Sequence, residues 1–587
     1  MFWLLIDVCA IRGILAMKWG EFLPSASMAL LFSYVAAWVV WGLGKRAFEI
    51  VLLASASVLY LYTLVTWFVF GLRIMPETLT LLMETNSGEA SEFVRVFCLE
   101  PGVIVAVGSL AVLWVAYACA VRWDCGICRL LHRMWTIPVP VKGVIAIILS
   151  AGLVYGCVNI VRFSKIFYVD TMKEGEDWIF GYYENVGNVY SDAVTAMAFS
   201  LRWLNLCGHE MGNWERMNAG LLDEDGLAVC EADSVDVVFV IGESFIKWHS
   251  SLYGYRLPTS PVLDEELRRG RLAVFDDYIS SCTRTSEAVK NLLTVKDSET
   301  SSKNWLSGAY VPVLFRNAGF NVYLWENQQA LGGGAWVFNS GLNRFIYNKP
   351  AVERCYSATN AGWFRFDGEL VDDFSKEVAV DASSRNFVLF HLMGQHHDAG
   401  CRRPDGWAKW DADDIVRSED WMTETMRLSI AEYDNATRYN DHVLGKIIDL
   451  FRHRDAVVVY VSDHGEEMYD YRPSFGRKAC EPCDEGKRLL FQNAVPMVVW
   501  WSEGYEKSHP DEVARLKASV ARPGMSDDIG QLLLSVGMVQ CRFYAPVKDI
   551  LSSDYECPSR RVSTGADFDS ITAGMGRGVI YGTPMTM

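Results

Sequence analysis

The sequence lacks an excess of positive charge. It contains 54 Lys and Arg residues against 71 Asp and Glu residues, which gives a formal net charge of -17 at pH 7. A basic patch with interleaved aromatic residues, the usual footprint of a nucleic-acid-binding protein, is also absent. Because an acidic domain repels the phosphate backbone, we expect no nucleic-acid partner. Internal repeats and long low-complexity tracts are absent as well, so nothing indicates a repeat architecture.

The first third of the chain contains four long apolar stretches with almost no internal charge. Each has about the length that an α-helix needs to cross a bilayer. They are residues 24–43, 46–71, 101–121 and 140–162. Residues 2–17 are a fifth candidate, although Asp7 and Arg12 interrupt the apolar run, and they lack the basic start and the cleavage site of a removable signal peptide. We therefore expect a transmembrane domain of about five helices over residues 1–163.

Basic residues in the short loops predict the orientation of these helices. Lys45 and Arg46 join the first two stretches, and four basic residues cluster between the last two: Arg122, Arg129, Arg133 and Lys142. By the positive-inside rule both loops are cytoplasmic. The intervening loop, residues 72–100, is then expected to face outward, as is everything after about residue 163.

From about residue 233 the pattern changes to short apolar runs between helical or loop stretches. The runs are VVFVIG, NVYLW, NFVLFHLMG, VVVYVSDHG and VPMVVWW. Dense Val, Ile and Phe without alternation are typical of parallel strands covered on both faces. The sequence thus predicts an α/β domain with a mainly parallel sheet over residues 233–545. The aromatic and charged residues 164–232 are expected to be an interfacial linker with amphipathic helices, or a plain interdomain linker, and residues 546–587 a C-terminal tail.

Acidic and imidazole side chains follow two of these runs. Glu243 follows VVFVIG, and Asp463 and His464 follow VVVYVS. Because ligands gather beyond the carboxyl ends of parallel strands, these side chains are expected to converge. One nitrogen and two carboxylate ligands suit Zn²⁺ and leave a fourth position open, as catalytic sites require. Each residue alone has an ordinary structural explanation, such as a helix N-cap for Asp463, but together they indicate one metal site.

A metal site of this kind needs a nucleophile, and the segment SSCTRTSEAVKNLLT (280–294) offers several hydroxyl groups at a predicted helix start. Thr283, Thr285 and Ser286 are all candidates. Zn²⁺ lowers the pKa of a coordinated hydroxyl group, and a helix N-terminus attracts phosphate. The structural alternative is that these residues only cap the helix.

An ordered set of motifs resembles the phosphoethanolamine transferase family of the alkaline phosphatase and sulfatase superfamily. The motifs are GES (242–244), YGY followed by PTSP (258–261), SCTRTSEAV, HLMGQH (391–396) and SDHGE (462–466). The resemblance runs across nearly the whole chain. It implies an alkaline-phosphatase-like α/β/α domain in which Glu243, Thr285, Asp463 and His464 bind one zinc ion, with Thr285 as the nucleophile.

The resemblance also implies the reaction and the place where it occurs. The family transfers phosphoethanolamine from phosphatidylethanolamine through a phospho-threonine intermediate. The acceptor would be lipid A, a core sugar or another envelope glycan. The chain would be a multi-pass protein of the bacterial inner membrane with its catalytic domain in the periplasm.

Several further positions match the family or depart from it. His396 matches a histidine that contacts the substrate phosphate or a second zinc ion, with His397 as second choice. A later histidine of the family is absent, so a second zinc ion is uncertain and Arg477 or Lys478 is a candidate to neutralise the phosphate. In the outward loop Thr85 and Glu89 match residues that approach the lipid headgroup, whereas Leu81 stands where the family has Asn.

Two other functions are compatible with parts of this pattern, and a third, a sulfatase, is disfavoured. A related phosphotransferase of the lipoteichoic-acid type would carry glycerophosphate as its headgroup. A sulfatase would need Cys or Ser in a C-x-P-x-R context, which CTRTS does not provide. A metal-binding envelope sensor without catalysis is the non-enzyme alternative, and metal content together with lipid turnover would separate it from the enzymes.

Overall fold

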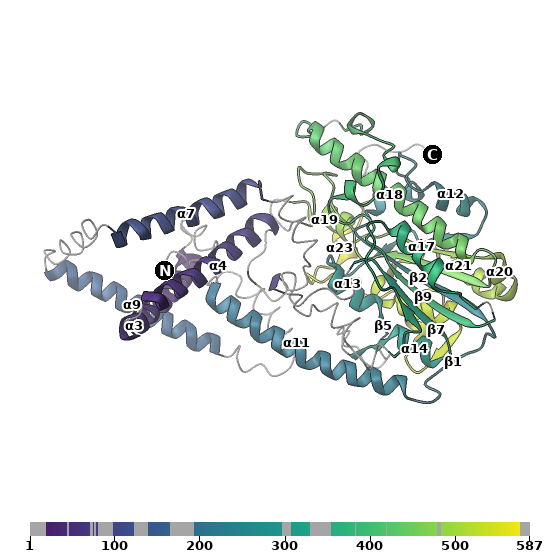
Figure 1. Ribbon diagram of the computed structural model, residues 1–587, viewed down its shortest axis with the longest axis horizontal. Coiled ribbons are helices and arrows are strands. Elements are labelled where there is room, and N and C mark those ends of the chain that lie inside the picture. Colours follow the sequence, from purple (N-terminus) through teal and green to yellow (C-terminus); the bar gives the residue numbers. More distant parts are fainter. Residues whose placement is uncertain are drawn as a thin grey trace. The chain divides into compact units, whose positions relative to one another are not determined.

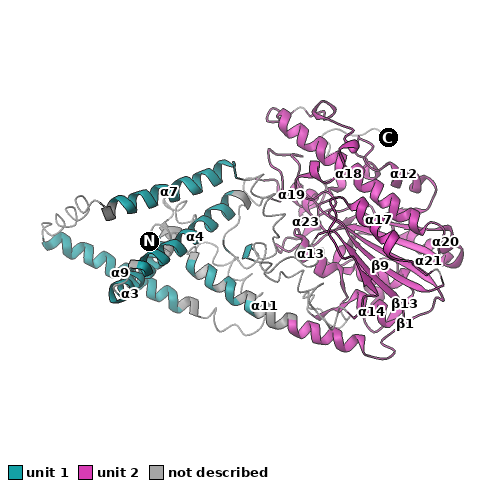
Figure 2. Cartoon of the chain, viewed as in Figure 1, with its two compact units in different colours: residues 1–210 teal, residues 211–587 magenta. Residues whose placement is uncertain are grey.

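We describe a computed structural model of the chain. The structure describes residues 19–43, 46–70, 74, 78–79, 98–122, 139–164, 193–295, 307–328, 354–381, 383–417, 419–477 and 483–575. The chain divides into two compact units, residues 1–210 and 211–587 (Figure 2).

The first unit contains four helices that are long and apolar enough to cross a membrane. They are α3 (Trp19–Leu43), α4 (Arg46–Phe70), α7 (Pro101–Arg122) and α9 (Val139–Ser164) (Figure 1). Helix α3 packs against α9, where Asn159 Nδ2 donates to Ser27 Oγ at 3.3 Å, and α4 packs against α7. Many of their apolar side chains are exposed, as lipid contact requires. The four predicted helices are therefore present, and the fifth candidate, residues 2–17, lies outside the described residues.

A seven-stranded sheet forms the centre of the second unit. Its strand order is β3-β11-β10-β2-β9-β7-β8. The bounds are β2 (Val235–Gly242), β3 (Leu272–Val274), β7 (Asn321–Glu326), β8 (Ala358–Thr359), β9 (Arg385–His391), β10 (Ala456–Ser462) and β11 (Met497–Trp501). The five strands from β10 to β8 are parallel, whereas β11 is antiparallel to both of its neighbours. The predicted α/β fold is confirmed, and its sheet is mixed.

Helices cover both faces of this sheet (Figure 1). On one face Val237, Phe239 and Ile241 of β2 pack into a core shared with α13 (Thr285–Leu292), α14 (Val311–Asn317) and α22 (Ile529–Val536). On the other face Val238 and Val240 pack into a core shared with α12 (Pro261–Arg268), α17 (Asp367–Glu377) and α18 (Glu424–Phe451). Burial on both sides explains why these strands are apolar without alternation.

Smaller elements complete the unit. They are α19 (Glu485–Gln492), α20 (Glu503–Ser508), α21 (Pro510–Ser519), α23 (Phe568–Thr572), and the pairs β1 (Ala228–Cys230) with β13 (Val539–Cys541), β4 (Tyr278–Ile279) with β12 (Gly524–Met525) and β5 (Thr294–Val295) with β6 (Ala309–Tyr310). The long helix α11 (Ala193–Leu222) lies in the predicted linker and contains the division between the two units. In the predicted tail, Phe568 is buried in an apolar cluster and Arg560 forms ion pairs with Asp277 and Asp569, so this segment is packed into the unit as far as residue 575.

Candidate metal centre

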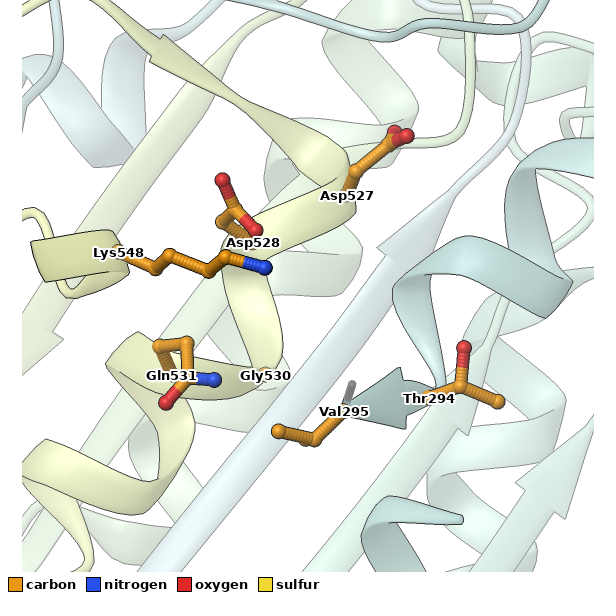
Figure 3. Close-up of a pocket in the computed structure, with 7 residues that line it drawn as sticks. All are labelled: Thr294, Val295, Asp527, Asp528, Gly530, Gln531 and Lys548. Atoms are coloured by element: carbon orange, nitrogen blue, oxygen red, sulfur yellow. The ribbon is translucent and has the colours of Figure 1, made fainter. Parts of the chain in front are cut away.

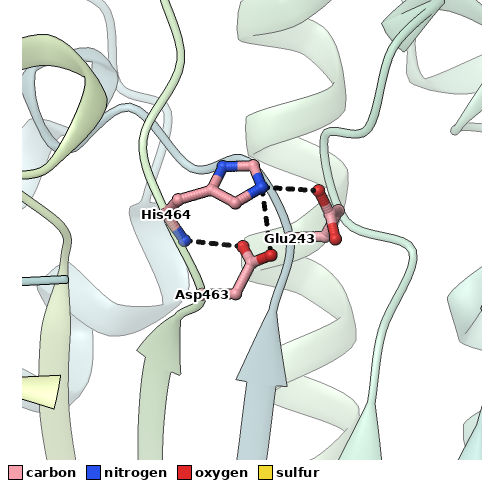
Figure 4. Close-up of side chains that lie close together, drawn as sticks. All are labelled: Glu243, Asp463 and His464. Carbon is pink, nitrogen blue, oxygen red and sulfur yellow. Dashed lines mark hydrogen bonds and ion pairs between the residues drawn. The ribbon is translucent and has the colours of Figure 1, made fainter. Parts of the chain in front are cut away.

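The carboxyl ends of β2 and β10 bring three predicted ligands together. The two strands are parallel neighbours, and Gly242 and Ser462, their last residues, are partners in the register. Glu243 and Asp463 follow them directly, and Asp463 N donates to Gly242 O at 3.0 Å. Because the two strands are parallel and end at paired residues, the side chains of the residues that follow lie side by side (Figure 4).

Glu243, Asp463 and His464 form a buried cluster. One ligand atom of each lies within 4.8 Å of those of the other two, and the three residues are fully buried. His464 Nε2 is 3.4 Å from Glu243 Oε1 and 3.1 Å from Asp463 Oδ2 (Figure 4). This spacing is compact enough for the three side chains to surround one ion.

Thr285 stands at the first position of α13 and meets this cluster. Its Oγ1 donates to Glu243 Oε2 at 2.9 Å and lies 3.3 Å from His464 Nε2. Cys282, three residues earlier in the same segment, is buried beside Ser281 and Asn291, and burial holds the pKa of its thiol well above the usual range. Of the three candidate hydroxyls, the structure thus brings Thr285 into contact with the predicted ligands Glu243 and His464, while the side chain of Ser286 lies outside the described residues.

The backbone around Glu243 is held in unusual conformations. Ser244 has a positive φ of 54°, donates from Oγ to Glu243 Oε1 at 2.7 Å and from N to Asp463 Oδ1 at 3.0 Å. Gly394 has φ 48°, and a Cβ there would lie 2.9 Å from Glu243 O, so the loop after β9 requires glycine at this position. Strained residues of this kind are common where a side chain must be aimed at a ligand.

Burial and neighbouring charges set the protonation of the cluster. Burial and the Arg477 guanidinium lower the pKa of His464 to about 3, so its imidazole is neutral at physiological pH. Burial and the charge of Glu243 raise the pKa of Asp463 well above its usual range. Burial by itself would raise the pKa of Glu243, but the neighbouring imidazoles and Arg477 hold it below its usual range. Two buried acids this close need a cation to be ionised together.

The residues present fit a zinc ion. His464 Nδ1 donates to Gly465 O at 2.9 Å, so Nε2 carries the lone pair; this nitrogen lies next to the carboxylates and is contacted by Arg477 Nη1. Asp463 Oδ2 is buried and has no hydrogen-bond partner among the described residues. An imidazole nitrogen, two carboxylate oxygens and the Thr285 hydroxyl make a four-membered donor set of the kind that Zn²⁺ prefers.

Two polar side chains, Gln328 and Arg477, contact the cluster. Gln328, two residues beyond the end of β7, donates from Nε2 to Glu243 Oε2 at 2.7 Å and to Leu392 O at 3.0 Å. Arg477 Nη1 contacts His464 Nε2, and its Nε lies 3.8 Å from the buried Glu466. The sequence patterns did not single out Gln328, although a polar residue just after a predicted strand at this edge of the sheet was a usable signal.

The predicted substrate residue His396 lies on the loop after β9. Its Nδ1 is 3.2 Å from Arg402 Nη2, and Gln395 N, the neighbouring amide, donates to Glu243 O at 3.1 Å. Burial lowers the pKa of His396 to about 3. His397, the second choice, stacks on Phe475 with ring centroids 5.4 Å apart. The other predicted residues of this group, Thr85, Glu89 and Lys478, lie outside the described residues.

A small pocket lies beyond the other end of α13. Thr294, Val295, Asp527, Asp528, Gly530, Gln531 and Lys548 line it (Figure 3). Thr285 begins α13, whereas Thr294 follows the end of the helix, about 12 Å away for eight helical residues. The pocket therefore belongs to a different part of the unit from the metal cluster.

Comparison with known families agrees with this geometry. The sulfatase family model matches residues 236–535, which is more than half of the 587-residue chain. The chain belongs to the sulfatase family. All three carboxylate and imidazole residues of the cluster, together with Thr285, lie inside the part that matches this family.

Known members similar to this chain are phosphoethanolamine transferases, so the resemblance predicted from the motifs is confirmed. EptC of Escherichia coli O18:K1:H7 is 27% identical over 463 residues, which cover 76% of this chain and 73% of that protein. The integral membrane lipooligosaccharide phosphoethanolamine transferase A of Neisseria meningitidis matches with a TM-score of 0.57 and 16% identity over 94% of this chain and 96% of the other. The periplasmic domain of Escherichia coli EptC in complex with Zn matches with a TM-score of 0.50 and 23% identity over 61% of this chain and 98% of the other.

Proposed function

We propose that this protein is a zinc-dependent phosphoethanolamine transferase. Its donor is phosphatidylethanolamine, and its acceptor is lipid A, a core sugar or another envelope glycan. The observation that carries the proposal is the contact of the Thr285 hydroxyl with Glu243 and His464 in a buried cluster suited to one metal ion. The transferases similar to this chain support the headgroup, and the Zn complex of the EptC domain supports the metal.

In the first step Thr285 Oγ1 attacks the phosphorus of the donor. A bond forms between Oγ1 and phosphorus, the bond from phosphorus to the glycerol oxygen breaks, and the proton that leaves Thr285 ends on the released diacylglycerol. A bound zinc ion would make the hydroxyl acidic and draw charge from the phosphoryl oxygens. In the second step an acceptor oxygen attacks the same phosphorus, and Thr285 regains its proton.

The residues around the cluster have separate tasks in these steps. The Glu243 carboxylate orients the Thr285 hydroxyl. Gln328 donates to that carboxylate, and its second hydrogen bond, to Leu392 O, fixes the Gln328 amide in place. Arg477 supplies a positive charge to the phosphate where the family's further histidine is absent. His396, neutral and next to Arg402, is placed to contact a phosphate oxygen or the departing group.

The membrane unit would keep the catalytic unit at a bilayer. Four candidate spanning helices tether the catalytic unit to a bilayer, where both the donor and a glycolipid acceptor reside. We assign the protein to the bacterial inner membrane with its catalytic unit in the periplasm, one zinc ion per chain, and Thr85 and Glu89 as contacts to the ethanolamine headgroup. A Glu89 carboxylate would pair with the ethanolamine ammonium group.

Mass spectrometry of the intact chain tests the proposal. The purified full-length protein is incubated with phosphatidylethanolamine, quenched in acid and digested. We expect one phosphoethanolamine group on Thr285 and release of diacylglycerol. The Thr285→Ala variant is expected to lose both, with diacylglycerol release reduced by about 10³-fold or more. Thr283→Ala, which removes a hydroxyl two residues earlier in the same segment, is the matched control and should keep the native rate.

The alternatives give different products in the same assay. A glycerophosphate headgroup on Thr285 from phosphatidylglycerol would indicate a lipoteichoic-acid type of enzyme. Phosphate or sulfate release into water without acceptor modification would indicate a hydrolase. If Thr285→Ala releases diacylglycerol at the native rate, the assigned nucleophile is incorrect.

A further inference from the structure

A short loop beside the candidate metal centre is fixed in place by buried amides. This loop, residues 360–367, connects β8 to α17. At its start Asn360, 2% exposed, accepts from Glu326 N at 3.0 Å and donates back to Glu326 O at 2.8 Å. In its middle Phe364 N donates to Asn327 Oδ1 at 2.9 Å. The loop is therefore tied to the end of β7, directly before Gln328.

The end of the loop is tied to the segment that carries His396. Asp367, 5% exposed, accepts from Met393 N at 3.0 Å and from Gly394 N at 2.8 Å. Its Oδ1 also accepts from Asn327 Nδ2 at 2.9 Å, so the two anchors of the loop contact each other. The loop thus bridges the two segments that place Gln328 and His396 at the metal cluster.

Burial alternates along this loop. Phe364 and Phe366 pack against the core that α17 and α18 share with the sheet, and Phe366 meets the Tyr439 ring edge-on at 6.3 Å between centroids. Trp363 is 53% exposed, and Arg365 is exposed with its guanidinium 5.0 Å from the Phe366 ring centroid. Phe364 and Phe366 therefore fix the loop to the core, while Trp363 and Arg365, which alternate with them, are exposed to solvent.

An exposed indole two residues before an exposed guanidinium is chemically suited to an anionic sugar. The flat indole face packs against the C-H face of a sugar ring, and the guanidinium binds a phosphate or carboxylate through two parallel hydrogen bonds. A membrane-docking surface would instead present several apolar and lysine side chains together, whereas the third exposed residue of this loop is the small Ala361. The fixed backbone also lowers the entropy lost when a ligand binds.

We infer that Trp363 and Arg365 form an acceptor subsite that binds a sugar carrying a phosphate or carboxylate group. The inference rests on the proposed transfer reaction and adds the residues that select its acceptor. Trp363 stacks on the sugar ring, and Arg365 pairs with the anionic substituent. The donor headgroup binds on the metal side of the same edge, so different residues recognise the donor and the acceptor.

Separate assays of the two half-reactions test this subsite. The full-length protein in detergent is given fluorescently labelled phosphatidylethanolamine, and diacylglycerol release reports the donor step. Transfer to the envelope glycolipid fraction that the wild-type chain modifies reports the acceptor step. We expect Trp363→Ala and Arg365→Ala each to raise the acceptor KM about tenfold and to leave the donor step within about twofold of wild type. Trp363→Phe should restore most of the acceptor affinity, because it keeps an aromatic face.

Matched controls make the outcome decisive. Val416 is 74% exposed in the same unit, and Val416→Ala should change neither step. An acceptor KM that stays native in both loop variants would overturn the subsite while leaving the transferase intact. A higher KM for the donor in vesicles, with the acceptor KM native, would show that the loop binds lipid, which also overturns the inference. Loss of the donor step in the wild-type chain would instead refute the proposed function itself.

Discussion

Two buried histidines in this protein each lie between two carboxylates, yet their protonation is opposite. His464 lies within 3.4 Å of Glu243 and Asp463, and burial together with Arg477 lowers its pKa to about 3. His249 Nδ1 lies 2.6 Å from Asp434 Oδ1 and its Nε2 lies 2.9 Å from Asp470 Oδ1. Burial alone would lower the pKa of His249, but these two acids raise it to about 9.

The hydrogen bonds explain the difference. Both ring nitrogens of His249 donate to carboxylates, and Tyr255 stacks on the ring at 4.7 Å and donates to Asp434 Oδ2 at 2.7 Å. Arg417 also reaches Asp470, at 3.3 Å, so two cations balance two acids. In His464, Nδ1 donates to the carbonyl of Gly465, and Nε2 is an acceptor. The His249 cluster is thus a closed ion network, whereas the two acids of the His464 cluster still need a cation between them.

The His249 network lies close to the candidate site in the chain and supports it. His249 follows Glu243 by six residues, Asp470 follows His464 by six, and Asp434 belongs to α18. The neighbouring Tyr433 of α18 donates to Ser244 O at 2.5 Å and accepts from Ile246 N at 2.7 Å. The network therefore joins the two strand-end segments to one helix, and we expect it to act on stability while the metal cluster acts on catalysis.

The largest expected effect comes from removing the histidine of the metal cluster. His464→Gln takes away the only nitrogen donor of the set, so we expect zinc content to fall below about a tenth of an ion per chain and transfer to fall by about 10³-fold. The unfolding midpoint in the presence of a chelator should stay close to native. Metal analysis, diacylglycerol release and urea unfolding measure these three quantities. A variant that retains zinc would refute the ligand assignment.

The matched change at His249 should lower stability and leave zinc binding intact. His249→Gln leaves two buried acids without their shared cation, so we expect the free energy of unfolding to fall by about 3 kcal/mol. Zinc content per folded chain should remain native, and activity per folded chain should fall far less than in His464→Gln. Urea unfolding followed by tryptophan fluorescence, with metal analysis at low urea, checks both. Native stability in this variant would contradict the closed ion network.

A smaller effect is expected from the guanidinium beside the metal cluster. Arg477→Gln removes a positive charge from the phosphate site, so kcat/KM for the donor should fall by about 10-fold to 100-fold, with zinc still bound. Arg477→Lys should recover part of this loss. Arg561→Gln, at an exposed position of the same unit, is the matched control. Unchanged donor kinetics in Arg477→Gln would remove Arg477 from the phosphate site.

The smallest effect is a dependence of stability on alkaline pH. The folded-state pKa of His249 is raised to about 9, above the unfolded value of about 6.5. A raised pKa means that this contribution is fully present below about pH 6.5 and is lost as the pH rises through about 9, with a slope of at most about 1.4 kcal/mol per pH unit. The difference in unfolding free energy between native and His249→Gln, measured in chelator from pH 6 to pH 10, should therefore shrink. A difference that stays constant over this range would exclude a protonated His249.

The sequence predicted the metal cluster better than the ion network for a physical reason. Glu243 and Asp463 each follow an apolar run that reads as a buried strand, and parallel strands bring such positions together. His249 has no comparable signal, because its partners Asp434 and Asp470 are 185 and 221 residues away and lie on a helix and a loop. Thr285 was selected among several hydroxyls only through the family resemblance.

Other features were outside the reach of sequence patterns. The run VPMVVWW was grouped with the parallel strands, whereas β11 is antiparallel, because a strand buried on both faces has the same composition in either direction. Gln328 and the loop of Trp363 and Arg365 depend on how segments after β7 and β8 meet, which periodicity does not specify. Residues 546–575 show no apolar periodicity, so the sequence did not indicate that Arg560 forms a partly buried ion pair or that Phe568 is buried.

X-ray diffraction at the zinc absorption edge, on crystals of the full-length chain, tests the central claim most directly. The account predicts one strong anomalous peak per chain about 2 Å from Glu243, Asp463, His464 Nε2 and Thr285 Oγ1. A peak at another place, or none at this cluster in protein that contains zinc, would contradict it.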